Sequence, residues 1–282
     1  MDIERVGICG SGIMGAGVAE VAARAGYEVV LRSRTLASAD AAVNAIGKSL
    51  SRHVEKGRMQ KEEADEVVAR VRPSTNLHEL SHCQLVLESV IEDLPTKKEL
   101  FEELDLVTDD DTVLASNTST LPLVEMAMAT KKPDRVVGVH FFNPATVMAL
   151  VEVVEAITTS EETVQTALEF AKQCGKQPVR VKDRAGFIVN ALLFPYLNNA
   201  VRLLESGTAS KEDIDAAMKA GCGFPMGPLE LLDLVGLDTS LAIIEALYAE
   251  FGDPHYVPQP LLRRMVAAGQ LGRKTKSGFY TY

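Results

Sequence analysis

Up to about residue 183, short runs of apolar residues alternate with segments in which apolar residues recur at helical spacing. Short runs rich in Val, Ile and Leu predict strands over residues 5–10, 27–31, 84–90, 112–115, 136–140, 150–154 and 177–181. Between them, apolar residues at helical spacing predict helices up to residue 25 and over residues 37–56, 61–71 and 94–107. Strands that alternate with helices are typical of an α/β fold with a parallel sheet.

From residue 184 onward the pattern is helical only. Helices are predicted over residues 187–205 with a kink at Pro195, from a capping pattern at Ser210, from Leu229, and over residues 240–251 and 261–268. We therefore expect an α/β domain over residues 1–183 and a smaller all-α domain over residues 184–282. The helix over 187–205 is apolar on too many faces for a monomer surface, which predicts a homodimer.

The composition is that of an ordinary globular protein, because 46% hydrophobic and 24% charged residues exclude a disordered chain. A net charge of -10 argues against nucleic-acid binding, so any anion site has to be local. The N-terminus lacks the features of a signal peptide. The longest uncharged run, residues 185–201, is too polar and too short for a membrane span, and we interpret it as a buried helix.

The four cysteines, Cys9, Cys83, Cys174 and Cys222, stand far apart and form no C-x-x-C pair. This spacing suggests neither a disulfide framework nor a zinc site. We expect a reduced, cytoplasmic protein without a metal site.

The first strand runs directly into Gly10-Ser-Gly12-Ile-Met-Gly15, a G-x-G-x-x-G that opens a helix. Gly10 permits the tight turn, Gly12 lets backbone approach a pyrophosphate, and Gly15 lets the helix pack close to the strand. The unpaired N–H groups at the helix start, around Ile13 and Met14, suit an anion. The motif predicts a Rossmann-type dinucleotide-binding domain; the alternative is a glycine-rich turn without a function.

The second strand ends in Leu31-Arg-Ser-Arg34 and lacks the acidic residue that usually holds the ribose 2′-hydroxyl of NAD. A hydroxyl at Ser33 between the guanidinium groups of Arg32 and Arg34 suits a 2′-phosphate. We predict a preference for NADP(H), with NAD(H) possible. The alternative is that the arginines are only solvated loop charges.

The run from Val136 ends in an imidazole, His140, and Asn143-Pro144 turns the chain soon afterwards. The next strand carries a single carboxylate within its apolar ladder, Glu152. If these strands are neighbours, Glu152 accepts a hydrogen bond from one ring nitrogen of His140 while the other nitrogen handles a substrate proton. The alternative is a core histidine and a solvent-facing glutamate.

More polar residues follow the strand ends, at the edge where such sheets bind ligands. Glu92 and Lys97 follow the strand over 84–90, and Ser119 follows the strand over 112–115. Ser119 suits a substrate oxygen, the cap of the next helix, or both. The last turns of the helix over 37–56 are basic, which fits either an anion-binding face or a mixed solvated surface.

These residues resemble the short-chain L-3-hydroxyacyl-CoA dehydrogenases, most closely the bacterial 3-hydroxybutyryl-CoA dehydrogenases, over essentially the whole chain. The shared segments are Gly10-Ser-Gly-Ile-Met-Gly15, Ser116-Asn-Thr-Ser119, His140-Phe-Phe-Asn-Pro144, Val151-Glu-Val153, Gly186-Phe-Ile-Val-Asn190, Pro225-Met-Gly-Pro-Leu229, Asp233-Leu-Val-Gly-Leu-Asp238 and Gly278-Phe-Tyr280.

The resemblance implies an oxidoreductase that interconverts a short 3-hydroxyacyl-CoA and its 3-oxoacyl-CoA. It implies His140 as general base with Glu152 as its partner, and Ser119 and Asn190 as hydrogen-bonding residues for the substrate. It also implies contacts to the cofactor from Glu92, Lys97, Asn143 and Lys274, and to the CoA moiety from Ser49 and Lys56. The helical domain is expected to serve dimerisation and to complete the substrate site.

The chain departs from the family pattern at two places. Ser33 replaces an acidic residue, and Ala145-Thr146 replaces the usual Val-Pro after Pro144, so a chain-length preference does not carry over. Two other functions remain: a dehydrogenase of a free hydroxy acid such as a sugar acid, and a cofactor-sensing binding protein without catalysis.

Overall fold

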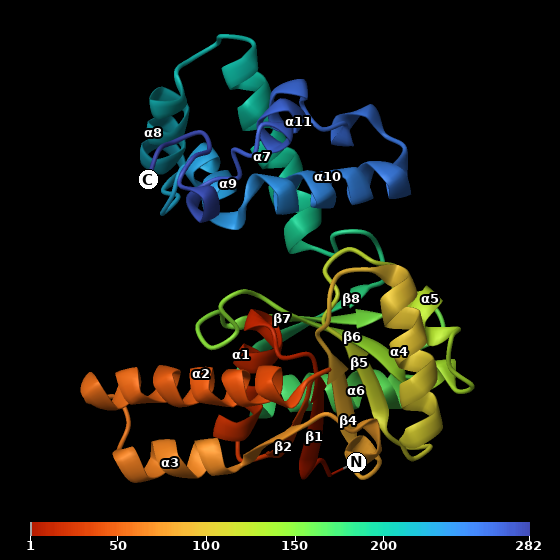
Figure 1. Ribbon diagram of the computed structural model, residues 1–282. Coiled ribbons are helices and arrows are strands. Elements are labelled where there is room, and N and C mark those ends of the chain that lie inside the picture. Colours follow the sequence, from red (N-terminus) through yellow and green to blue (C-terminus); the bar gives the residue numbers. More distant parts are fainter. Residues whose placement is uncertain (1) are drawn as a thin grey trace. The chain divides into compact units, whose positions relative to one another are not determined.

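The structure is a computed structural model that describes residues 2–282. Its chain divides into two compact units, one that extends to Asp183 and one that comprises Arg184–Tyr282 (Figure 1). The first unit is built around a single sheet, and the second is helical. The α/β fold followed by a smaller all-α region is therefore confirmed.

The sheet of the first unit has eight strands in the order β3-β2-β1-β4-β5-β6-β7-β8. Its strands are β1(Arg5–Cys9), β2(Glu28–Arg32), β3(Val71–Ser74), β4(Leu85–Glu88), β5(Val113–Ser116), β6(Val136–Phe141), β7(Leu150–Glu155) and β8(Gln177–Lys182). All neighbouring strands are parallel except β6 and β7. The order of β1 to β5 reverses beside β1, as in Rossmann-type sheets, so ligands are expected where the carboxyl ends of β1 and β4 meet.

The helices of the first unit are α1(Ile13–Arg24), α2(Leu36–Glu55), α3(Lys61–Ala69), α4(Leu94–Val107), α5(Leu123–Ala127) and α6(Glu161–Gln173). Buried residues of α1, α2, α3 and α6 share one hydrophobic core with the strands. Helices α4 and α5 contact each other and form a separate group (Figure 1). Because strands such as β4 are buried throughout, their sequences are continuous apolar runs.

The structure differs from the sequence predictions at the end of one helix and in elements that were not predicted. The helix predicted over 61–71 ends at Ala69, because Val71 begins the edge strand β3 and Pro73 within that strand cannot continue a helix. Helix α6 was not predicted, although Ser160 caps it by accepting a hydrogen bond from the Thr163 N–H.

The second unit consists of α7(Val189–Glu205), α8(Lys211–Cys222), α9(Pro228–Val235), α10(Leu237–Phe251) and α11(Pro260–Ala267). Ser210 caps α8 as predicted, and Pro195 lies inside α7. Two buried aspartates organise the unit. Asp215 accepts hydrogen bonds from the N–H groups of Leu229 and Glu230, and Asp233 accepts them from Phe279 and Tyr280. No helix within residues 2–282 is long and apolar enough to cross a membrane.

Candidate active site

The glycine turn between β1 and α1 leaves room for a ligand at one position only. A Cβ at Gly10 would lie 2.2 Å from the carbonyl oxygen of Ser89, and one at Gly15 would lie 2.0 Å from that of Gly10. A Cβ at Gly12 would meet nothing within 4 Å, and no side chain caps α1 there. Open space beside uncapped N–H groups fits the pyrophosphate of a dinucleotide.

The end of β2 places Ser33 next to this turn. Ser33 is buried, and its hydroxyl lies 2.7 Å from that of Ser11. Arg34 is exposed, whereas the buried Nε of Arg32 has no hydrogen-bond partner within the described residues. This corner therefore presents hydroxyls and guanidinium groups, and no carboxylate follows β2 at the expected place.

His140 and Glu152 are direct cross-strand partners in the antiparallel pair of β6 and β7. His140 Nδ1 lies 2.8 Å from Glu152 Oε2, and both side chains are buried. The ring of Phe142 packs on the imidazole with centroids 4.5 Å apart. The predicted adjacency of the two strands is therefore found, and a solvent-facing Glu152 is excluded. The pairing sets the orientation of the imidazole ring.

The loop after β5 carries Ser119 and joins several strand ends. Asn117 accepts a hydrogen bond of 2.8 Å from the Phe141 N–H, which connects the loop to the strand that carries His140. The amide of Asn117 also donates to the Ser89 hydroxyl at 3.4 Å. Sequence reasoning included Asn117 only as part of a motif, because its partners lie 24 and 28 positions away.

Glu92 is the centre of a hydrogen-bond network with this loop. Its Oε1 accepts from the Thr118 hydroxyl at 2.6 Å, from the Ser119 N–H at 2.9 Å and from the Thr120 N–H at 3.3 Å. Burial alone would raise the pKa of Glu92, but the Lys97 ammonium and these hydrogen bonds outweigh it and hold the pKa below its ordinary value. Glu92 is therefore an anion that binds the Ser119 loop.

Lys97 is almost completely buried between two carboxylates. Its Nζ lies 2.5 Å from Glu88 Oε1 and 3.2 Å from Glu92 Oε2. Glu88, at the end of β4, also accepts from the Ser116 hydroxyl at 2.6 Å. Sequence reasoning missed Glu88 as part of the site, because it ends an apolar strand and its partner Ser116 lies 28 positions away.

Ser119 does not cap the following helix, so that reading of the sequence is wrong. Helix α5 begins after Pro122 and has no side-chain cap from its own N-terminal residue. Its Val124 N–H instead donates to Asp183, which follows β8, at 3.0 Å. A partner from 59 positions away could not be inferred from the local pattern.

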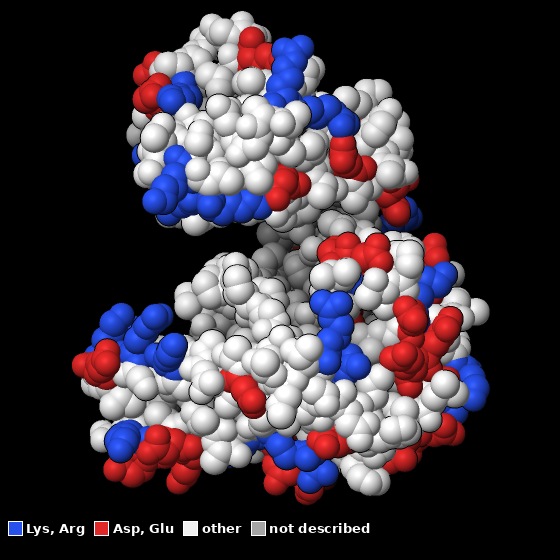
Figure 2. Space-filling view, in the orientation of Figure 1, with Lys and Arg blue, Asp and Glu red and all other residues white. Residues whose placement is uncertain are grey.

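The basic end of α2 lies apart from these networks. Lys48, Arg52, Lys56 and Arg58 are exposed, and Figure 2 shows Lys and Arg side chains gathered over the last turns of α2, at the left of the view. Ser49, on the same helix, donates a hydrogen bond to the buried Glu20 of α1. Burial raises the pKa of Glu20, and Arg24 is 3.9 Å away. Ser49 therefore lies against α1, whereas Lys56, directly after the end of α2, is exposed.

The remaining predicted residues are placed as follows. Asn143 is exposed in the loop after β6, and the next residue but one, Ala145, is buried against Gly17 of α1. Ala145, where the chain departs from the family pattern, therefore lies in the hydrophobic core of the first unit. Asn190 is buried in the first turn of α7, and Lys274 pairs with Asp238 at 2.5 Å, both within the second unit.

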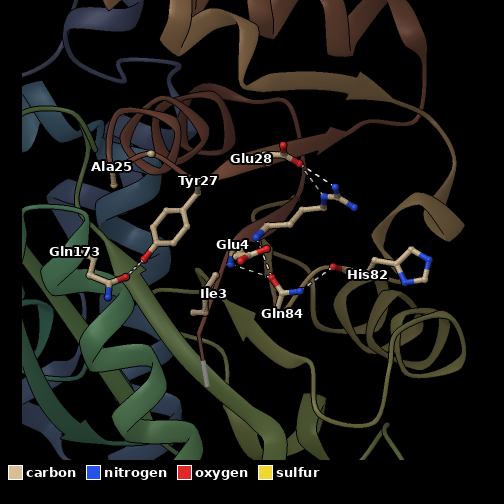
Figure 3. Close-up of a pocket in the computed structure, with 10 residues that line it drawn as sticks. Ile3, Glu4, Ala25, Tyr27, Glu28, His82, Gln84 and Gln173 are labelled. Atoms are coloured by element: carbon tan, nitrogen blue, oxygen red, sulfur yellow. Dashed lines mark hydrogen bonds and ion pairs between the residues drawn. The ribbon is translucent and has the colours of Figure 1, made fainter.

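The first unit also has a hollow at the amino edge of the sheet, opposite the carboxyl edge (Figure 3). Its polar groups are engaged with each other. Arg5 pairs with Glu28 at 2.8 Å, Tyr27 donates to Gln173, and Gln84 accepts from the Glu4 and Arg5 N–H groups. The hollow therefore offers no convergent unpaired groups to a ligand, and the candidate site is the carboxyl edge.

The chain is similar to known proteins over nearly its whole length. The sequence profile of the 3-hydroxyacyl-CoA dehydrogenase NAD binding domain matches residues 5–184, and that of the 3-hydroxyacyl-CoA dehydrogenase C-terminal domain matches residues 186–282. A 3-hydroxybutyryl-CoA dehydrogenase of Mycobacterium tuberculosis is 52% identical over 99% of both chains, and one of Clostridioides difficile is 46% identical over 99% of both.

Solved structures are equally similar. The crystal structure of M. tuberculosis FadB2 superposes with a TM-score of 0.97 at 51% identity over 100% of both chains. That of (S)-3-hydroxybutyryl-CoA dehydrogenase PaaH1 from Ralstonia eutropha has a TM-score of 0.98 at 41% identity, over 100% of this chain and 99% of the other. With both profiles matched along nearly its full length, the chain belongs to the 3-hydroxyacyl-CoA dehydrogenase family of nicotinamide-dependent oxidoreductases.

Proposed function

We propose that this enzyme interconverts 3-hydroxybutyryl-CoA and acetoacetyl-CoA, the substrate class named for its relatives in M. tuberculosis and C. difficile. The observation that carries the proposal is the buried 2.8 Å pair of His140 and Glu152, at the strand ends where Rossmann-type sheets bind ligands. A binding protein without catalysis has no need of an oriented imidazole in this position.

In the oxidative direction, His140 removes the proton of the substrate 3-hydroxyl. Nδ1 is engaged by Glu152, so proton transfer uses Nε2, and the nearby carboxylate stabilises the imidazolium that forms. In the reductive direction the imidazolium returns this proton to the oxygen. Ser119 and Asn190 donate hydrogen bonds to the substrate oxygen, which favours the geometry for transfer. When bound, the nicotinamide supplies the hydride chemistry.

The turn at Gly10, Gly12 and Gly15, with the N–H groups of Ile13 and Met14, holds the pyrophosphate of this cofactor. The family resemblance further assigns cofactor contacts to Glu92, Lys97, Asn143 and Lys274. The buried position of Lys97 means that it acts there through its carboxylate partners. At the CoA moiety, Ser49 and Lys56 are the proposed contacts, with the exposed cations at the end of α2 facing the phosphates.

For the cofactor we infer a preference for NADP(H) over NAD(H). A 2′-phosphate brings roughly two negative charges, which the Ser33 hydroxyl and the guanidinium groups of Arg32 and Arg34 can bind. One such charge-assisted contact is worth about 1.5–3 kcal/mol, which corresponds to a preference of roughly 10- to 150-fold. Ser33→Asp with Arg34→Gln should reverse the ratio of the two specificity constants. A higher kcat/KM with NADH in the unmodified enzyme would contradict the inference.

The two units have separate tasks in this proposal. The first, residues 1–183, binds the dinucleotide, and the second, residues 184–282, forms a homodimer and completes the substrate site. The second unit exposes large apolar side chains that suit a subunit interface, among them Leu192 and Phe224. A reduced, cytoplasmic enzyme fits cysteines of which Cys9 and Cys83 are buried and unpaired.

The decisive experiment is the oxidation of NADPH or NADH followed by absorbance with acetoacetyl-CoA as substrate. We expect turnover with the CoA ester and none with free acetoacetate or a sugar acid. Equal activity on a free hydroxy acid would favour the alternative dehydrogenase. Cofactor binding without turnover of any of these substrates would favour a sensing protein.

A further inference from the structure

We propose that Glu88 and Lys97 are positioning residues for Ser119, and that they act through Glu92 to hold the loop Thr118–Thr120. The inference rests on the proposed function, because it assumes that the Ser119 hydroxyl meets the substrate. It assigns Lys97 a task other than a direct cofactor contact. It also adds Glu88, which the family resemblance did not indicate.

The burial of these charges is the first observation. The side chains of Lys97 and Glu88 are 1% and 0% exposed, whereas that of Glu92 is 38% exposed. Moving an ammonium and a carboxylate out of water is costly unless each is matched by close partners. Glu88 meets this condition with three donors: the Val90 N–H at 2.6 Å, Lys97 Nζ at 2.5 Å and the Ser116 hydroxyl at 2.6 Å.

The second observation is that Lys97 has a second carboxylate partner. After pairing with Glu88, its Nζ still approaches Glu92 Oε2 at 3.2 Å. This contact leads outward, because the other oxygen of Glu92 accepts from Thr118, Ser119 and Thr120. The buried ammonium thus fixes the orientation of the carboxylate on which the Ser119 loop is held.

Both ends of the loop depend on the same cation. At its base, the Ser116 hydroxyl donates to Glu88 and accepts from the Thr118 N–H at 3.2 Å. At its tip, the Ser119 and Thr120 N–H groups donate hydrogen bonds to Glu92. Removing Lys97 leaves Glu88 and Glu92 as two unneutralised carboxylates on either side of the loop, so Ser119 should lose its orientation.

A double-mutant cycle of Lys97→Met with Ser119→Ala tests this dependence. In the unmodified background, Lys97→Met should lower kcat with acetoacetyl-CoA by about 10- to 100-fold. In the Ser119→Ala background the same change should cost less than about threefold, because its effect passes through Ser119. Equal losses in both backgrounds, or a loss confined to cofactor affinity, would overturn the proposal.

A second variant covers the case in which Lys97→Met alone does not fold. Glu88→Gln with Lys97→Met removes both fully buried charges and still disconnects Glu92, and it should show the same dependence on Ser119. The matched control is Arg135→Met, which breaks another buried ion pair, Arg135–Asp105 at 2.8 Å, at the amino edge. Its effect on kcat should be small and equal in both backgrounds. An unmodified enzyme that does not turn over acetoacetyl-CoA would instead refute the proposed function.

Discussion

The two edges of the sheet in the first unit both contain buried charges, but only one of them presents a charged group to a ligand. At the amino edge, the buried Arg135 donates to Asp105 and to the carbonyl oxygens of Asp109 and Thr112. Within residues 2–282, this network continues to the Thr108 hydroxyl and the Lys131 N–H, and not to a further charged side chain. At the carboxyl edge, the buried pair Glu88–Lys97 continues to Glu92, which is partly exposed and binds the Ser119 loop. Buried charge alone therefore does not identify a functional site. The carboxyl edge differs because its buried charges continue to a partly exposed carboxylate, Glu92.

The largest effect that separates the two edges should come from His140→Gln. This change keeps a side chain of similar size but removes the base, so kcat should fall by about 10²- to 10⁴-fold. The dissociation constant of the cofactor should stay within about twofold, as measured by fluorescence titration. If the variant kept its turnover, His140 would not be the base, and the two edges would not differ in function as proposed.

A substitution at the amino edge should lower the stability of the protein and leave kcat nearly unchanged. Arg135→Met leaves Asp105 buried without its cation, and breaking a buried pair in this way costs about 3–5 kcal/mol of the free energy of unfolding. Urea denaturation measures this loss, while kcat of the folded enzyme should remain within about twofold of the unmodified value. A large fall in kcat at unchanged stability would show that the amino edge takes part in function.

A smaller effect is expected at the exposed cations of α2. Lys56→Glu should raise KM for acetoacetyl-CoA roughly fivefold to tenfold and leave kcat nearly unchanged, because one partly screened charge contact is reversed. Lys132→Glu is the control, since Lys132 is also exposed but pairs with Asp110 at the amino edge. The same rise in KM in both variants would indicate a general effect of net charge.

The smallest effect concerns Glu20, a buried carboxylate whose neighbours do not fully compensate its burial. Its pKa in the folded protein is raised, so the protein loses stability as the pH rises above the unfolded-state pKa. Glu20→Gln should therefore raise Tm at pH 7 by about 1–4 °C, and the gain should disappear near pH 4, where Glu20 is protonated in both states. Thermal unfolding at both pH values measures this; a Tm that falls at pH 7 would mean that the Ser49 and Arg24 contacts outweigh burial.

Local patterns in the sequence predicted the elements that depend on local spacing. Helix α4 has the predicted bounds, and the pairing of His140 with Glu152 follows from two short strands joined by one loop. The glycine turn was predictable for the same reason, since strand, turn and helix are consecutive.

The groups that sequence reasoning missed have distant partners. Glu88 meets Ser116 from 28 positions away, and α5 is capped by Asp183 from 59 positions away. The edge strand β3 was missed because Val67, Val68 and Val71 also fit helical spacing. These contacts depend on the packing of the sheet, which no local pattern encodes.

The antiparallel pairing of β6 and β7 has a consequence for how the enzyme can evolve. His140 and Glu152 are only 12 positions apart and are held together by strand register, and in the loop of residues 142–149 the ring of Phe142 packs on the imidazole. A shift of register by one residue would turn Glu152 to the other face, so the strands tolerate few changes. Strand register does not constrain the rest of this loop, so a change such as Ala145-Thr146 is limited by the packing of Ala145 against Gly17 of α1 and leaves the base and its partner in place.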